Sequence, residues 1–267
     1  MLRITSKLAT RISIFLLLIF LILPIFVVIL LSLGPDRNVS FPPSGISLKW
    51  YVALFSENEW LNALAISLQI SLLTTSFSSV FGLLGSVAIY DMRPRSPLSS
   101  LSFALLATPL FIPAIVMGIG LSRVTEVLQL PDKLAVALSL SVVTTPLFMI
   151  CTLVSMQGVD TQLKNAAASL GANKLETFFL ITLPLIRRGL AIGAFIAFLL
   201  AFDELVITLF VAPPQIQTLP IKFWSTLRFY TSPLVAPVST IMLLAMVAVL
   251  TFTFYYGAKN EHATSRT

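Results

Sequence analysis

The chain has 267 residues, of which 57% are hydrophobic and 10% are charged, and its formal net charge is +6 at pH 7. A water-soluble domain of this size cannot bury so much apolar surface, so a lipid bilayer must be part of its solvent. Lys and Arg are scattered through short loops without a basic stripe, which favours membrane topology over nucleic-acid binding as the explanation of the charge. Cys151 and His262 are the single cysteine and histidine, so disulfide frameworks, Cys/His metal sites and histidine triads are excluded.

The first apolar run, residues 12–33, has about the length of a bilayer-spanning helix and follows Arg3, Lys7 and Arg11. A cleaved signal peptide is the alternative interpretation. The run is longer than a typical signal peptide core and does not end in a small-x-small cleavage site. We therefore expect an uncleaved first membrane span.

Further apolar runs predict five more spans, over residues 61–90, 98–121, 134–157, 185–211 and 234–256. The expected fold is an all-α membrane protein in which residues 1–267 form a single transmembrane domain. If the N-terminus is cytoplasmic, that side receives eleven of the 17 Lys and Arg residues. This bias predicts that both termini and the polar 160–184 segment lie in the cytoplasm.

The second and third spans have features of helices that pack on other helices. Small residues recur at four-residue spacing on two neighbouring stripes: Ser71, Thr75 and Ser79, and Ser78, Gly82 and Ser86. Such residues let helix backbones approach closely. In the third span, Pro109 and Pro113 lack amide donors and predict a bend. The bend either lines a path or only shapes the bundle.

The 160–184 segment is a polar, helix-forming insert between two apolar runs. Asp160 or Thr161 can cap a helix that Ala166, Ala167 and Ala168 favour. Four residues fall on roughly one face of this helix: Leu163, Ala166, Ala167 and Leu170. Gly171 removes a side chain where the helix ends or meets a partner. The helix therefore either lies in a groove on another protein or packs under its own bundle.

The spacing within this segment resembles a motif of permease subunits in ATP-binding-cassette importers, E-A-A-x3-G-x9-I-x-L-P. The matching positions are Asn165, Ala166, Ala167, Gly171, Ile181, Leu183 and Pro184. Only the first departs from the motif, because Asn165 replaces the acid. A contact that requires that carboxylate must here use a neutral amide or be absent. In the family this loop docks into a cleft on a cytoplasmic ATPase, which implies an ATPase-coupling role for these residues and Leu170.

The resemblance extends to three other segments, residues 41–55, 109–121 and 202–210, which are similar to the second permease of spermidine/putrescine importers. It implies the type I importer fold and transport of a polyamine from the periplasm to the cytoplasm across the bacterial inner membrane. Permeases for iron, phosphonate, sulfate or amino acids look broadly similar, so another small solute is the alternative.

The resemblance also implies a set of partners. They are a second permease subunit in a heterodimer, two cytoplasmic ATPase subunits, an external binding protein and membrane lipid. The chain lacks the G-x4-G-K-[ST] loop that binds phosphates, so we expect a non-catalytic subunit. It is expected to bind no cofactor or metal, with ATP and Mg²⁺ held by the ATPase subunits.

Asp203 and Glu204 lie within the apolar fifth span, where carboxylates are costly and usually face protein or water. If the helix starts near Arg188, Asp203 lies about 22 Å along it, toward the external half of the bilayer. Two acids at this depth favour a cationic solute through charge pairing and hydrogen bonds. The alternative is a packing pair neutralised by a basic residue or by protonation.

Two other function classes deserve comparison. An ion-coupled secondary transporter could use Asp203 and Glu204 as an ion site, but it predicts an internal repeat, of which the six unequal spans give little sign. An intramembrane enzyme needs a catalytic motif, and the sequence contains neither HExxH nor GxSxG. We therefore expect a transport subunit.

Overall fold

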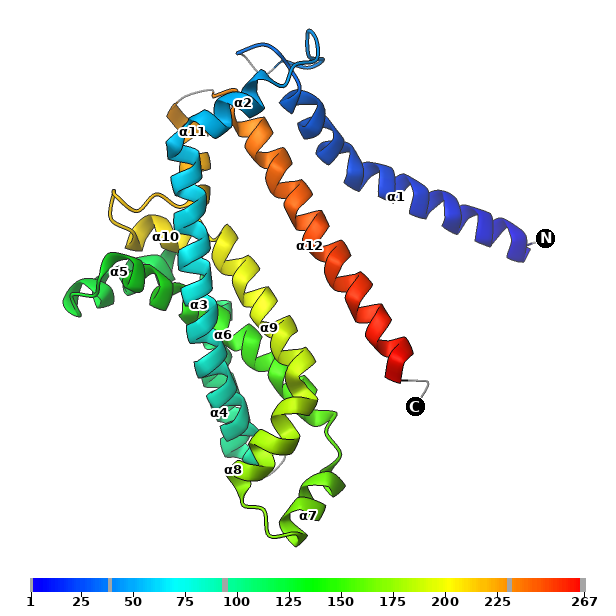
Figure 1. Ribbon diagram of the computed structural model, residues 1–267, viewed down its shortest axis with the longest axis vertical. Coiled ribbons are helices and arrows are strands. Elements are labelled where there is room, and N and C mark those ends of the chain that lie inside the picture. Colours follow the sequence, from blue (N-terminus) through cyan, green and yellow to red (C-terminus); the bar gives the residue numbers. More distant parts are fainter. Residues whose placement is uncertain (1, 38–39, 93–95, 230–231, 265–267) are drawn as a thin grey trace. The chain divides into compact units, whose positions relative to one another are not determined.

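The structure, a computed structural model, describes residues 2–37, 40–92, 96–229 and 232–264. Within these ranges the regular elements are helices (Figure 1). Contacts divide the chain into two compact units. The central unit comprises Asn62–Lys222, and the terminal unit comprises Met1–Leu61 and Phe223–Thr267.

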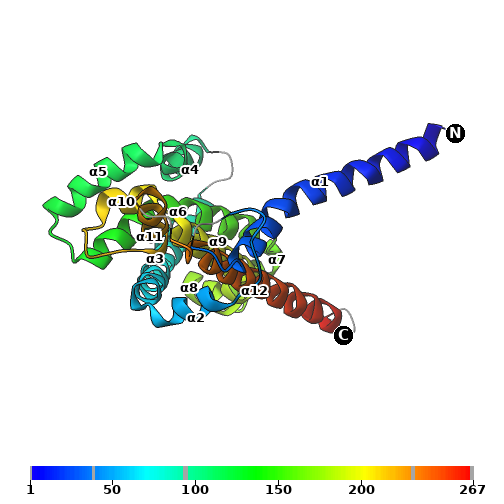
Figure 2. The same cartoon turned by 90° about the horizontal axis from the view of Figure 1, so that it is seen from above.

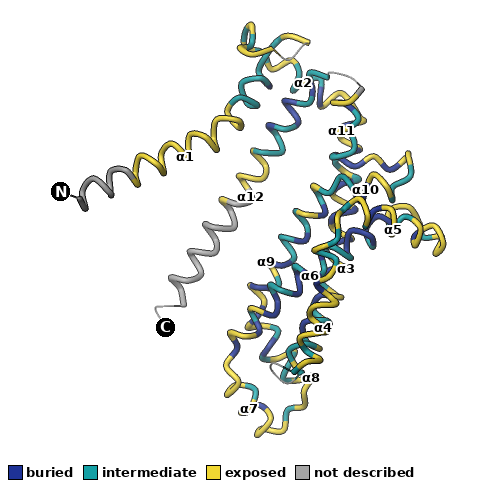
Figure 3. The backbone as a smooth tube through the Cα atoms, turned by 180° about the vertical axis from the view of Figure 1, so that it is seen from behind, coloured by how far each residue is buried: buried dark blue, intermediate teal, exposed yellow. Residues whose placement is uncertain are grey.

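The terminal unit contains α1 (Leu2–Ser32), α2 (Lys49–Ser56) and α12 (Val235–Thr264). The helix α1 occupies the first predicted span, and its described side chains are largely exposed up to Phe26 (Figure 3). It packs against α12, which covers the sixth predicted span; most side chains beyond residue 248 lie outside the described residues. Near α2, the hydroxyls of Ser32 and Tyr51 form a 2.7 Å hydrogen bond. The short α11 (Leu219–Phe229) begins in the central unit and ends in the terminal one.

The central unit is built around α6 (Asp132–Gln157), whose side chains are the most continuously buried (Figure 3). It packs along α9 (Leu183–Asp203), which presents small residues at four-residue spacing: Gly189, Gly193, Ala197 and Ala201. A Cβ added at Gly189 would lie 2.5 Å from the Cβ of Ser155 on α6. The two backbones can therefore approach closely only because α9 lacks side-chain bulk on this face.

The helix α3 (Asn58–Asp91) also packs on α6. One of the two predicted stripes faces α6 directly. Ser78 Oγ lies 2.6 Å from Thr144 Oγ1, and Ser86 Oγ donates to the carbonyl of Met149 at 3.2 Å. The hydroxyls of Ser71 and Thr75, on the second stripe, instead bond back to carbonyls of α3 itself. Hydroxyls thus connect α3 to α6 within an apolar bundle.

The bend predicted in the third span is confirmed. The chain runs through α4 (Pro97–Ala107) and the 3-10 turn η1 (Thr108–Phe111) into α5 (Ala114–Val127), and the axis turns by 102° (Figures 1 and 2). The predicted span over residues 98–121 falls within this bent pair of helices. Four of the described helices are long and apolar enough to cross a membrane, and this pair would make a fifth.

The fifth predicted span, residues 185–211, is also interrupted. The helix α9 ends at Asp203, Glu204 is extended with φ −73° and ψ 111°, and α10 (Val206–Val211) follows. The short α10 packs against α5 so closely that a Cβ on Gly118 would lie 2.9 Å from the ring of Phe210. Residues of α5 and α10 also pack on a buried apolar cluster that includes Ile70, Val136, Leu140, Ala201 and Ile207. The break therefore sits on the core of the central unit.

Candidate functional site

The 160–184 segment follows α6 and begins with a side-chain cap. Asp160 is extended, and its Oδ1 accepts a hydrogen bond from the backbone N–H of Gln162 at 2.8 Å. This bond satisfies an amide that the first turn of α7 (Thr161–Ser169) cannot pair internally. Of the two caps that the sequence allows, the structure uses Asp160.

The C-terminus of α7 is closed by a Schellman motif. The amide of Ala172 donates to the carbonyl of Ala167 at 3.0 Å, and the amide of Gly171 donates to that of Ala168 at 3.0 Å. Gly171 has φ +90°, in the left-handed region that favours glycine. No heavy atom lies within 4 Å of a Cβ added there. Backbone conformation, rather than close approach within the chain, is thus what requires this glycine.

A third cap starts the next helix. Asn173 Oδ1 accepts from the amide of Glu176 at 2.9 Å, and Glu176 Oε2 accepts from the amide of Asn173 at 2.8 Å. This capping box opens α8 (Lys174–Thr177), which continues through the π-helical η2 (Phe178–Thr182) into α9. In η2 the amide of Leu183 reaches back to the carbonyl of Phe178. The π turn lies just before Pro184, whose ring disfavours regular α-helical bonding.

Burial and side-chain contacts hold α7 against the rest of the central unit. Ala167 is 7% exposed, and Val159, which precedes α7, packs with Met156 and Ile186. The Nζ of Lys164 lies 4.1 Å from the ring centre of Tyr90, near the end of α3. Tyr90 itself packs against the Val159 cluster. Residues of α3, α6 and α9 therefore meet at the base of α7.

The rest of the predicted face of α7 is open. Leu163 is 46% exposed and Leu170 is 89% exposed, and Asn165 and Ala166 are also exposed. Most of α7 is accordingly drawn as exposed in Figure 3. Packing under its own bundle, one of the two interpretations of the sequence, therefore applies to Ala167 but not to the other residues of this face. The second half of the motif lies close to α7, because η2 contacts it. There Ile181 and Leu183 are half-buried and Pro184 is exposed.

The acidic pair lies at the opposite end of α9, about 30 Å away for 21 residues. Asp203 is exposed, whereas Glu204 is half-buried. Glu204 Oε1 accepts from the amide of Ile207 at 2.8 Å, and its carbonyl accepts from the hydroxyl of Thr208 at 2.9 Å. The side chain of Glu204 therefore caps α10, and the two neighbouring carboxylates have different surroundings.

Within the described part of the chain, neither carboxylate forms an ion pair with a basic side chain. Neutralisation by a basic residue of this chain, one form of the packing alternative, is thus not observed there. The same residues contain no cluster of three His, Cys, Asp or Glu side chains that could hold a metal ion.

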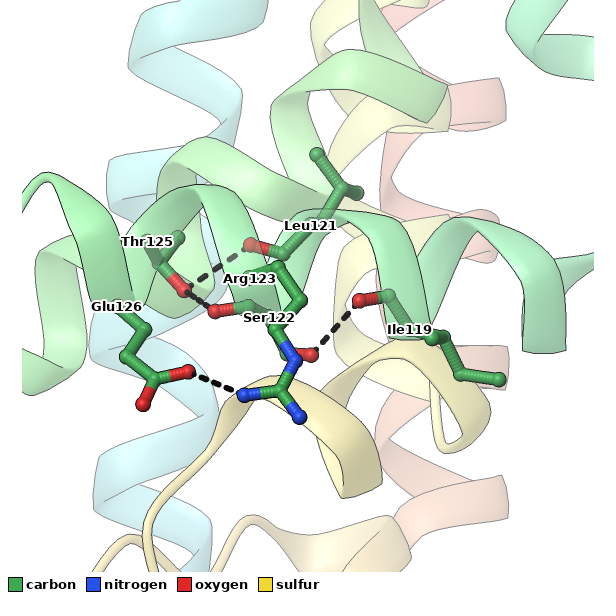
Figure 4. Close-up of polar contacts among 6 residues, drawn as sticks. All are labelled: Ile119, Leu121, Ser122, Arg123, Thr125 and Glu126. Carbon is green, nitrogen blue, oxygen red and sulfur yellow. Dashed lines mark hydrogen bonds and ion pairs between the residues drawn. The ribbon is translucent and has the colours of Figure 1, made fainter.

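The helix α5, which packs on α10, carries an exposed ion pair. Arg123 Nη1 lies 2.8 Å from Glu126 Oε2, with side chains 78% and 68% exposed (Figure 4). Beside them, the hydroxyls of Ser122 and Thr125 donate to carbonyls of the preceding turn (Figure 4). Such an exposed pair contributes little to stability.

Sequence reasoning missed two groups of residues that position these sites. The small residues of α9 at 189, 193, 197 and 201 have the same four-residue spacing that identified the stripes on α3, so the signal was available. Tyr90 gave no local signal, because its contact with Lys164 joins residues distant in the sequence.

Comparisons with known proteins agree with this architecture. Residues 79–259 match the family of binding-protein-dependent transport system inner membrane components. This match covers more than half of the chain, and the protein therefore belongs to that family.

Two relatives come from Escherichia coli. The putrescine transport system permease protein PotI is 28% identical over 249 residues, which cover 91% of this chain and 88% of PotI. The spermidine/putrescine transport system permease protein PotC is 29% identical over 236 residues, which cover 86% of this chain and 87% of PotC.

The fold also matches a solved structure of a bacterial alginate ABC transporter in complex with an alginate pentasaccharide-bound periplasmic protein. The TM-score is 0.69 at 16% identity, and the match covers 94% of this chain and 92% of that chain. The fold is therefore the all-α type I permease fold. The protein is a permease of an ATP-binding-cassette importer and lies in the inner membrane.

Proposed function

We propose that the 160–184 segment couples this permease to a cytoplasmic ATPase, with α7 as the docking helix. The observation that carries the proposal is that local caps hold α7 at one end of the central unit while Leu163, Ala166 and Leu170 stay exposed. Such an apolar face on a rigid helix suits a groove on another protein. The similarity to the importer motif supports the ATPase as that partner.

Force applied to α7 would reach the acidic break through α9. From Lys174 to Asp203 the chain is helical without interruption, so a displacement at one end is carried to the other. ATP binding would close the ATPases, draw the docked helices together and favour the outward-facing state, and hydrolysis would reset it. The interrupted helix at Glu204 is the place where such a displacement would alter a solute path, because interrupted backbone within a membrane lies in protein or lines a cavity.

The same proposal defines the assembly. A second permease, two ATPase subunits and an external binding protein would complete the importer, with ATP and Mg²⁺ bound by the ATPases and no cofactor bound by this chain. The permease would be non-catalytic, with both termini and α7 in the cytoplasm. The membership of the binding-protein-dependent family and the bias of Lys and Arg toward one side support this arrangement.

The proposed solute is a polyamine, and Asp203 is the residue proposed to attract it. Asp203 is exposed beside the break and has no basic partner among the described residues. The names of PotI and PotC support a di- or polyamine, whose ammonium groups would pair with a carboxylate. Glu204, the other proposed path residue, differs in that its carboxylate already caps α10.

Deleting Asn165 to Gly171 tests the coupling role. We expect loss of solute uptake and of ATPase copurification, while the chain still inserts into the membrane. Uptake in cells and affinity purification of the tagged permease measure both. Unaltered uptake in the deletion variant would contradict the proposal.

Asp203→Asn tests the solute path separately. We expect uptake of labelled putrescine and spermidine to fall at least about tenfold, which corresponds to about 1.4 kcal/mol of lost interaction. The ATPase should still copurify. Uptake by the original protein of a panel of labelled solutes that also includes amino acids, iron, sulfate and phosphonate identifies the solute. Normal kinetics of polyamine uptake in the Asp203→Asn variant would exclude the role of Asp203.

A further inference from the structure

The charged side chains around α7 are engaged within the permease. The carboxylate of Asp160 accepts from the amide of Gln162, and that of Glu176 accepts from the amide of Asn173. The ammonium of Lys164 lies 4.1 Å from the ring centre of Tyr90. Such a cation–π contact directs the one basic group of α7 toward its own bundle. Lys174, the remaining charge of the segment, lies on α8 instead.

The exposed face of α7 carries no charge. Leu163, Ala166 and Leu170 are three and four residues apart, so they share one side of the helix. Leu170 is the most exposed of them, at 89%. Beside them Asn165 presents a neutral amide at the position where the importer motif has an acid.

The uncharged face of α7 determines which ATPase surface it can bind with a gain in free energy. An apolar face gains free energy when it leaves water for an apolar groove, and no charge must be desolvated in the process. A basic group in that groove opposite Asn165 would lose its hydration without gaining a carboxylate partner. An uncharged groove is therefore the surface that α7 fits best.

We infer that α7 docks through an uncharged apolar face and that the ATPase surface receiving it is an apolar groove without a basic residue opposite Asn165. This inference rests on the proposed coupling function and adds the chemistry of the contact. Under this inference, the association of the permease with the ATPase is insensitive to salt and depends on Leu170.

The salt test uses the full-length permease in nanodiscs and the ATPase that copurifies with it. Raising NaCl from 0.1 to 1 M shortens the screening length from about 10 Å to about 3 Å. We expect the dissociation constant to change less than about threefold. Weakening of tenfold or more would show a charge-paired contact and overturn the inference.

Variants of α7 provide a second test. Leu170→Ala should weaken binding about tenfold or more, because a large apolar side chain is lost from the contact. Leu170→Met keeps the volume and should bind within about threefold of the original protein. Equal binding by the original protein, Leu170→Ala and Leu170→Met would overturn the inference.

Asn165→Glu restores the acid of the motif. With no basic residue opposite, the added charge should weaken binding several-fold, since it must be desolvated without a partner. Tighter binding that disappears in 1 M NaCl would overturn the inference. If instead the ATPase binds after deletion of residues 165–171, or if no ATPase copurifies with the full chain, the proposed function itself fails.

Discussion

The segments before and after α9 interrupt helical structure in different ways. Before α9, the 160–184 segment pairs its backbone groups with side chains only two or three residues away, such as Asp160 with the amide of Gln162. After α9, Glu204 also caps a helix, but α10 is held by its contact with α5, at Gly118 and Phe210. Local capping leaves the exposed side of α7 free for another protein. Tertiary packing places the acidic break within the central unit.

The acidic break after α9 and the α7 segment before it should therefore respond to different kinds of mutation. The break should depend on how α5 packs on α10, and it should tolerate changes in surface charge. The geometry of α7 should depend on backbone conformation and capping, and it should tolerate changes in bulk where space is open. The following variants can break or sharpen that distinction.

The largest effect is expected from Gly118→Leu. A Cβ at this position already meets the ring of Phe210 at 2.9 Å, so α5 and α10 must separate. Overpacking of this kind costs about 3 kcal/mol. Thermal unfolding of the purified protein measures the loss. Gly120→Leu is the matched control on α5, because a Cβ there meets nothing within 4 Å; equal losses in both variants would refute the proposed role of this packing.

A smaller effect is expected at Glu204. Replacement by Ala leaves the amide of Ile207 without its side-chain acceptor, which should cost about 1–2 kcal/mol, as for other helix caps. Glu204→Gln keeps a carbonyl acceptor and should remain within about 0.5 kcal/mol of the original protein. Unfolding and polyamine uptake should be measured on both variants. If Gln is as damaging as Ala, the negative charge rather than the cap is what this position requires.

At the other end of α9, Gly171→Ala should cost about 1–2 kcal/mol, because φ +90° is unfavourable for any side chain. Hydrogen exchange at the backbone amides of α7 and of Ala172 should report local opening. Gly158→Ala provides the control, since Gly158 also follows a helix but has φ −80°. Alanine there should be neutral or stabilising by up to about 1 kcal/mol. Similar destabilisation by both changes would argue against a conformational requirement at Gly171.

The smallest effect is expected from Arg123→Gln. Arg123 and Glu126 form an exposed pair on α5, with side chains 78% and 68% exposed. Solvent screens such pairs, so unfolding should shift by less than about 0.5 kcal/mol. Glu126→Gln should behave in the same way. A loss above 1 kcal/mol in either variant would mean that surface charge also maintains the α5 and α10 arrangement.

Several features followed from the sequence because their causes are local or compositional. The abundance of apolar residues requires a bilayer, Pro109 and Pro113 predict the observed bend, and Asp160 was one of two possible caps. Gly171 was expected either at a helix end or at a contact with a partner, and its φ of +90° shows that it ends the helix. The bend, the cap and the glycine each depend on residues within one or two helical turns, and composition is a sum over the chain, which is why a single sequence reveals them.

Other features were decided only by contacts between distant residues. The run around Asp203 has no proline or glycine to end a helix, so the interruption after α9 depends on the packing of α10 against α5 and the buried core. The burial of Ala167, in contrast to exposed Leu170, depends on how α7 lies against the central unit. Periodicity by itself placed both residues on one face. The sequence thus determined that apolar helices form the chain and limited the start and end of α7 to a few residues. Tertiary packing decided where the fifth span breaks and which side of α7 stays open, because those outcomes balance burial across the whole unit.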